Sequence, residues 1–94
     1  MSFELQFLPS ALKEWKKLGA PIREQLKKKL AERLVTPRVP KDALHGARDH
    51  YKIKLRSVGY RLVYRVEDQT VTVTVVAIGK REGDAVYLAV EKRR

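Results

Sequence analysis

The sequence predicts an α+β domain with the element order β-α-α-β-β-β-α, an antiparallel sheet with an αα-hairpin on one face. The first observation is that apolar residues recur every three or four positions between residues 12 and 34. The second is that apolar and polar residues alternate in segments between 51 and 66, followed by a β-branched segment. A length of 94 residues allows one modest core, so we expect a single domain over residues 1–94.

The first elements are a strand and a short helix. Residues 3–7 alternate apolar and polar side chains, as in a half-buried strand. Pro9 and Ser10 end this strand, and we expect Ser10 to cap the helix that follows. The apolar face of that helix consists of Leu12, Trp15 and Leu18. Gly19 then predicts its end.

A second helix is predicted from Pro21, which suits a first helical turn. Its apolar stripe recurs every four residues and consists of Ile22, Leu26, Leu30 and Leu34. Pro37 closes it. Because the turn between the two helices is tight, we expect an αα-hairpin.

The second half of the chain predicts three strands, a loop and a short helix. The strands are expected at residues 51–56, 60–66 and 70–78. Residues 79–83 are typical of a loop, and Asp84 is a candidate cap for a helix that holds Val86, Tyr87 and Val90. We expect the strands to form a meander with the helices packed on one face.

The charge of the chain suggests a polyanionic partner. Lys and Arg number 21 against 11 Asp and Glu, which gives a net charge of +10. Without cysteine, a disulfide scaffold, a thiolate zinc site and a cysteine nucleophile are excluded. No apolar run approaches the roughly 20 residues of a spanning helix, and no signal peptide is recognised. We therefore expect a cytoplasmic protein that binds nucleic acid rather than a membrane.

Strand alternation collects cations on one face of the predicted sheet. Residues 51–66 contain five cations and no Asp or Glu; the cations are Lys52, Lys54, Arg56, Arg61 and Arg65. Like charges on neighbouring strands are unfavourable unless an anion lies among them, which predicts a phosphate-binding surface. The alternative is an ordinary solvated face, since Lys and Arg are common on exposed strands.

Acid–base chemistry on this face has two possible sources. A ribonuclease active at neutral pH often uses two histidines, and His45 and His50 lie in the loop before the basic strand, although exposed or turn-capping loop histidines are the more usual case. Lysine is the other source, because crowding by like charges favours the neutral amine, and Lys52 and Lys54 point the same way. Arginines can clamp phosphate oxygens, so RNA could be cleaved by attack of its 2′-OH without a metal.

Two further features lie outside these strands. Lys27 and Lys28 begin a lysine run opposite the apolar stripe, with Glu24 and Glu32 four residues on either side of Lys28. This favours a solvated helix face that adds nonspecific attraction to RNA. Tyr87 follows the 79–83 loop, where its ring could stack on a base beside the basic face.

These residues resemble the RelE toxins of bacterial RelBE-type toxin–antitoxin modules. The similarity covers essentially the whole chain, and its strongest blocks are ALKEW (11–15), REQLKKKL (23–30), YKIKLRS (51–57), GYRLVY (59–64) and GKRE (79–82). The resemblance implies a microbial-ribonuclease-like fold and a cofactor-free mRNA interferase. Such toxins cleave mRNA in the ribosomal A site by 2′-OH attack, leaving a 2′,3′-cyclic phosphate.

The resemblance also implies roles for single residues. Lys54 is the general base, Lys52 and Arg61 stabilise the transition state, Arg81 assists the leaving group, and Tyr87 orients or stacks on the nucleotide. The remaining candidates for RNA contact are Arg56, Arg65, Lys80, His45, Lys27 and Lys28. His45 stands where such chains tend to carry an arginine, and relatives that use acidic and histidine residues keep His45 and His50 as candidates.

The implied partners are a RelB-like antitoxin, the 16S rRNA of the 70S ribosome, and mRNA, with operator DNA reached only through the antitoxin. A C-terminal helix at about residues 84–94 is a plausible element for the antitoxin to displace. Two alternatives stay open. One is a noncatalytic module that binds rRNA or the ribosome, and the other is a ParE-like gyrase inhibitor on the same fold.

Overall fold

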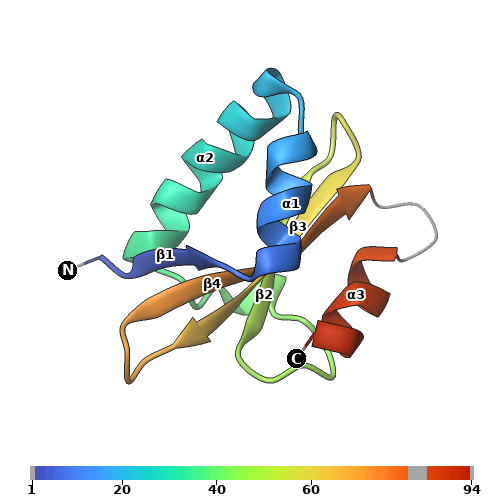
Figure 1. Cartoon of the computed structure of the whole chain (residues 1–94). Helices are drawn as coiled ribbons and strands as arrows, with labels where there is room; N and C mark the ends of the chain where they lie inside the picture. The colour runs from blue at the N-terminus through green and yellow to red at the C-terminus, as the bar shows by residue number, and fades with distance from the viewer. Residues whose placement is uncertain (1, 81–84, 94) are drawn as a thin grey trace.

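A computed structural model describes residues 2–80 and 85–93 of the chain. It contains three α-helices, four strands and one 3₁₀ turn (Figure 1). In chain order these are β1 (Glu4–Phe7), α1 (Pro9–Lys17), α2 (Ala20–Val35), the 3₁₀ turn Pro40–Asp42, β2 (His50–Leu55), β3 (Tyr60–Glu67), β4 (Thr72–Lys80) and α3 (Ala85–Arg93). The predicted α+β class and element order are confirmed.

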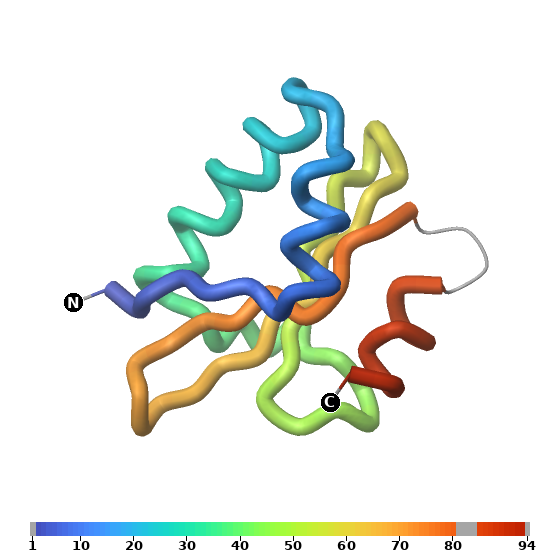
Figure 2. The backbone as a smooth tube through the Cα atoms, viewed as in Figure 1, coloured from blue at the N-terminus to red at the C-terminus, as the bar shows by residue number. Residues whose placement is uncertain are grey.

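The four strands form one sheet in the order β1-β4-β3-β2. The antiparallel meander of β2, β3 and β4 is as predicted. β1, however, runs parallel to β4 at the sheet edge, so the sheet is mixed rather than purely antiparallel. The αα-hairpin carries the chain away from β1, and β1 pairs with the strand that comes last in the chain rather than with the next one (Figure 2).

The larger core lies between the αα-hairpin and one face of the sheet. The hairpin contributes buried Ala11, Leu18, Leu26 and Leu30. The sheet contributes the alternate positions that the pattern predicted, including buried Ile53, Leu62 and Tyr64. On α1, Trp15 and Leu18 of the predicted stripe reach this core, whereas Ala11 is buried in place of Leu12, which is exposed.

The N-terminus of α1 also differs from the expectation. Leu8, in an extended conformation, is the N-cap, and no side chain caps the helix. Pro9 takes the first helical position, which its fixed φ angle favours. Ser10 consequently lies inside the helix and is not its cap.

The prediction that all helices pack on one face is wrong for α3. Val86 and Val90 of α3 pack with Val63, Val76 and Ala77 in a second, smaller core on the opposite face. Loop residue Leu44 joins this core, and Figure 2 shows the loop passing beside α3. β4 is buried from Thr72 to Ile78, so both of its faces need a cover, as in a continuously apolar central strand.

No helix among the described residues is both long and apolar enough to span a bilayer.

Candidate functional site

The cations of the meander form a row across two strands, β2 and β3, which we call the cationic row: Lys52, Lys54 and Arg61. In the antiparallel register Lys54 is paired with Arg61, and Arg61 is paired with Gly79 of β4. Lys52 lies two residues before Lys54 on the same face and is paired with Val63. Within residues 2–80 and 85–93, no carboxylate forms an ion pair with these three cations. The row is therefore available to an anion.

Tyr87 of α3 adjoins the cationic row. The Arg61 guanidinium donates a hydrogen bond to the Tyr87 hydroxyl and lies 5.7 Å from the centre of the Tyr87 ring. Both side chains are half-buried. The sequence suggested that Tyr87 could lie beside the basic face, and the structure brings it into direct contact with Arg61.

Close packing of α3 on β4 makes this contact possible. A Cβ atom placed on Gly79 would lie 2.9 Å from the Val86 Cγ2 atom, which is closer than side chains pack. Glycine at the position paired with Arg61 thus lets α3 approach the sheet. Because Tyr87 follows Val86, this approach places the phenol against the Arg61 guanidinium.

Arg33 of α2 holds the strand that carries both lysines. Its guanidinium donates to the Lys52 carbonyl oxygen at 3.2 Å, the Tyr64 hydroxyl at 2.9 Å and an Asp42 carboxylate oxygen at 2.6 Å. The Tyr64 hydroxyl in turn donates to the Pro37 carbonyl at 2.6 Å. Burial opposes the charge of Arg33, but the bonds to Tyr64 and Asp42 outweigh burial and raise its pKa. This network ties β2 to α2.

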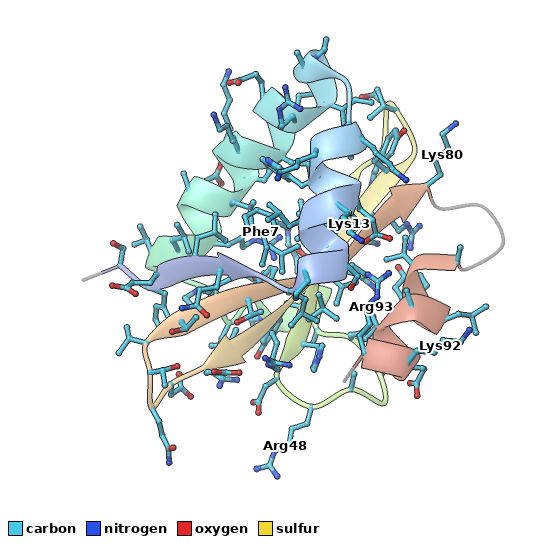
Figure 3. All side chains as sticks on the ribbon, in the orientation of Figure 1. Phe7, Lys13, Arg48, Lys80, Lys92 and Arg93 are labelled. Carbon is cyan, nitrogen blue, oxygen red and sulfur yellow. The ribbon has the colours of Figure 1, made fainter. Side chains whose placement is uncertain are left out.

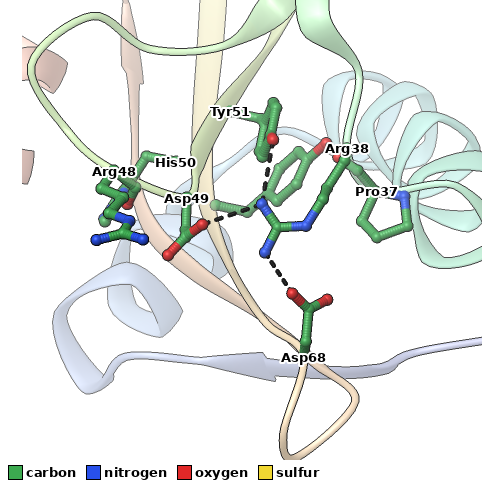
Figure 4. Close-up of polar contacts among 8 residues, drawn as sticks. Pro37, Arg38, Arg48, Asp49, His50, Tyr51 and Asp68 are labelled. Carbon is green, nitrogen blue, oxygen red and sulfur yellow. Dashed lines mark hydrogen bonds and ion pairs between the residues drawn. The ribbon is translucent and has the colours of Figure 1, made fainter.

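Arg38 lies in the loop after α2 and links it to the loop before β2 and to the turn between β3 and β4 (Figure 4). It donates to Asp68 at 2.7 Å, to Asp49 at 3.0 Å and to the Tyr51 hydroxyl at 3.3 Å. The hydrogen bond to Asp68 is the main cause of a raised Arg38 pKa. Sequence reasoning missed Arg33 and Arg38, since their partners lie on separate elements and no local pattern connects them.

Arg56 lies at the junction of two depressions beside Lys54. One is a polar groove of about 850 Å³ between α2 and the edge of β2, with Lys29 and Lys41 on its walls. The other, of about 290 Å³, is lined by Tyr60 and Arg61. Lys54 and Arg56 line both depressions. A phosphate chain could follow this surface with cations on either side.

The other predicted RNA-contacting residues lie away from the cationic row. Arg65 is paired with His50 in the register and forms an ion pair with Glu67 at 2.8 Å. Val63, and not Arg65, is the residue paired with Lys52. Lys80 is exposed at the end of β4 and points away from the sheet (Figure 3). Lys27 and Lys28 are exposed on α2, where Glu24 contacts Lys27 at 3.8 Å rather than Lys28.

The two histidines occupy different environments. His45 is exposed in a turn, whereas His50 is buried, with Nδ1 2.7 Å from the Arg48 carbonyl oxygen. His50 is therefore a buried residue at the start of β2 and not an exposed loop histidine. In the described part of the chain no cluster of three metal-ligating side chains occurs. Arg81 and the proposed cap Asp84 lie outside the described residues.

Comparisons with known proteins agree on one family. The sequence model of the family described as "ParE toxin of type II toxin-antitoxin system, parDE" matches residues 5–85. The chain is 56% identical over 93 residues to the mRNA interferase toxin RelE of Escherichia coli K12, covering 99% of this chain and 98% of the relative.

Solved structures agree with this likeness. A mutant of E. coli toxin RelE in the free state matches with a TM-score of 0.92 and 55% identity, over 99% of this chain and 98% of that one. A chain from the intact E. coli RelBE toxin–antitoxin complex matches with a TM-score of 0.84 and 57% identity, over 86% of this chain and 99% of that one.

Proposed function

The chain belongs to the RelE family of type II mRNA interferase toxins, and from this premise we propose that its cationic row cleaves mRNA on the ribosome. The observation that carries the proposal is the contact of three elements at one place. Lys54 of β2 is paired with Arg61 of β3, and Arg61 holds the Tyr87 hydroxyl of α3. Cations without an ion-paired carboxylate suit a reaction whose transition state gains negative charge on a phosphate.

The reaction is an in-line attack of a ribose 2′-OH on the neighbouring phosphorus. Lys54, as the general base, takes the 2′-OH proton, and the O–P bond forms as the P–O5′ bond breaks. Lys52 and Arg61 stabilise the negative charge on the phosphoryl oxygens. Arg81 assists departure of the 5′ oxygen, which takes up a proton from water. The products are a 2′,3′-cyclic phosphate and a 5′-OH end.

Tyr87 and Arg61 act as a unit in this scheme. The guanidinium, which lies 5.7 Å from the ring centre, is oriented by the phenol before any substrate arrives. Preorganised donors contribute more than donors that must be ordered during the reaction, because no reorganisation is needed. We assign the half-buried Tyr87 ring to stacking on the base beside the scissile bond.

Ribosome binding would use the wider cationic surface. The groove between α2 and β2 leads to Lys54. Its lining includes Lys29, Lys41 and Arg56, together with Glu32 and with Asp42, which is ion-paired with Arg33. We assign Arg56 to the RNA at this junction, and Lys80, Lys27 and Lys28 to nonspecific attraction by rRNA. Phosphate contacts position a protein on RNA without reading sequence, so the row itself need not confer codon preference.

A RelB-like antitoxin is the proposed regulator. RelE, a protein 57% identical to this chain, was solved in an intact complex with its antitoxin. A relative of that antitoxin would cover or distort the cationic row, and operator DNA would be reached through the antitoxin. The proposed compartment is the cytoplasm, where the ribosome and mRNA lie.

The proposal is tested on programmed ribosomes with a vacant A site. Purified protein is added, mRNA ends are mapped, and the new 3′ end is analysed for a cyclic phosphate. We expect cleavage in the A-site codon and little cleavage of free mRNA. No cleavage where a known relative cuts would refute the proposal, and inhibition of gyrase supercoiling instead would favour the ParE-like alternative.

A noncatalytic module that only binds RNA makes a different prediction for Lys54→Ala. Removing one phosphate contact would weaken ribosome binding modestly and leave growth inhibition unchanged. Catalysis predicts lost growth inhibition by a variant that still folds and still binds. Comparing binding and toxicity for this one variant separates the two functions.

A further inference from the structure

The edge of β4 is completed by side chains where β1 ends. The β1 pairing stops at Phe7, which is paired with Val75, and the Leu8 N–H donates to the Val75 carbonyl at 3.0 Å. Beyond that point the Ile78 N–H donates to a Glu14 carboxylate oxygen at 3.1 Å. The Val76 carbonyl accepts from Arg93 at 2.9 Å. One residue from α1 and one from α3 thus replace the missing part of a neighbouring strand.

Glu14 and Arg93 also bind each other through two hydrogen bonds. The two guanidinium nitrogens of Arg93 lie 2.9 Å and 3.3 Å from the two Glu14 carboxylate oxygens. The side chains are 32% and 23% exposed, so water screens the pair only partly. Figure 3 shows Arg93 on the side of α3 that faces α1, whereas Lys92 points away. We call this contact the Glu14–Arg93 bridge.

The position of α3 depends on contacts of this kind. The helix has nine residues, and isolated helices shorter than about 12 residues are marginal in water. Its buried side chains are Val86 and Val90. The start of the helix is therefore held by the packing of Val86 against Gly79, and its end is held by the Glu14–Arg93 bridge. Tyr87 lies between these two anchors.

We propose that Glu14, although it lies on α1 and outside the cationic row, is a positioning residue for RNA cleavage. Through Arg93 it holds α3 in the position in which the Tyr87 hydroxyl accepts a hydrogen bond from Arg61. This inference rests on the proposed ribonuclease function. Glu14 touches neither substrate nor reacting atoms, and its effect on the reaction passes through Tyr87.

The first test measures position without cleavage. Glu14→Gln keeps an oxygen for the Ile78 N–H but turns its other group into a donor that faces Arg93. We expect amide exchange protection in α3 to fall by about 3- to 10-fold, with changed Tyr87 ring and Arg61 side-chain NMR shifts. Glu4→Gln, which removes an exposed carboxylate on β1 beside the first residue of β4, is the matched control and leaves these signals unchanged. Unchanged α3 signals in Glu14→Gln would overturn the inference.

The second test measures single-turnover cleavage on programmed ribosomes. We expect Glu14→Gln to lower the cleavage rate about 5- to 50-fold and to change the half-saturating ribosome concentration less than about twofold, because displaced groups mainly lose rate. Arg93→Lys, which keeps the charge but not the paired geometry, should give an intermediate rate. Glu4→Gln should cut as the wild type does.

A double variant separates positioning from general stability. In a Tyr87→Ala background, Glu14→Gln should lower cleavage by less than about twofold more, since its route of action is gone. Its effect on thermal unfolding should persist in that background. An equal loss of cleavage with and without Tyr87 would refute the inference. Absence of cleavage by the wild type would refute the proposed function instead, while the NMR measurement would still decide whether Glu14 positions Tyr87.

Discussion

Replacing Gly79 by alanine tests whether close packing of α3 sets the geometry of the site. The new Cβ would lie 2.9 Å from the Val86 Cγ2 atom. Val86 is 3% exposed and β-branched, so its side chain has little freedom to rotate away. The methyl group must therefore push α3 away from β4.

The size of the displacement follows from ordinary contact distances. Carbon atoms pack at about 3.5–4.0 Å, so the 2.9 Å contact must open by roughly 0.6–1.1 Å. Overpacking of this kind costs about 1–3 kcal/mol of stability. A shift of about 1 Å at a catalytic group can cost about 100-fold in rate. We expect Gly79→Ala to lower the cleavage rate about 100-fold and to cost about 1–3 kcal/mol of stability.

The assay combines thermal unfolding with single-turnover cleavage on programmed ribosomes. Val86→Ala, added to Gly79→Ala, removes the methyl group that the new Cβ meets and should restore much of the lost rate. Val86→Ala alone loses buried surface and should cost stability with a smaller effect on cleavage. Wild-type cleavage by Gly79→Ala, or no recovery in the double variant, would refute the reasoning.

Three further predictions concern stability and are read from urea unfolding midpoints. Arg33→Met should cost about 3 kcal/mol by leaving Asp42 and Tyr64 without their partner, and a loss below about 1 kcal/mol would contradict the network. Burial raises the pKa of the Tyr64 phenol, so the unfolded chain loses this proton first as pH rises. Its contribution is complete below about pH 10 and declines above it, and Tyr64→Phe should therefore lose less stability than the wild type between pH 9 and 11. Val71 has a φ of 52°, which strains a β-branched residue, so Val71→Asn should gain about 0.5–1 kcal/mol, and a loss would contradict the strain.

The fold could be predicted where one periodicity dominates. Alternation in β2 and β3 correctly identified the buried positions Ile53, Leu62 and Tyr64. β4 carries apolar or β-branched residues at nearly every position, so its sequence does not show which face is covered. The register shift between Val63 and Tyr64 adds a further change of alignment that no pattern signals. Because β4 shows no alternation, the sequence did not predict that α3 packs on the second face of the sheet.

The charged residues of the candidate site could be predicted from the sequence, but the residues that position them could not. Strand alternation predicted that Lys52, Lys54 and Arg61 share one face, and the register agrees, whereas their catalytic roles stay a prediction. The contact of Tyr87 with Arg61 depends on Gly79, whose role is visible only when α3 is in place. Arg33 and Glu14 could not be found, since an arginine or glutamate on a helix resembles solvated surface until its distant partners are known.

In the function that we propose, the cationic row performs chemistry and does not only bind RNA. The most direct measurement compares Lys54→Ala with Lys16→Ala, an exposed lysine on α1, in ribosome binding and single-turnover mRNA cleavage. We predict that Lys54→Ala cuts about 100-fold or more slowly, as loss of a general base requires, while ribosome binding changes less than about threefold. Lys16→Ala should match the wild type in both. Cleavage by Lys54→Ala at the wild-type rate, or a loss no larger than its loss of binding, would contradict the claim.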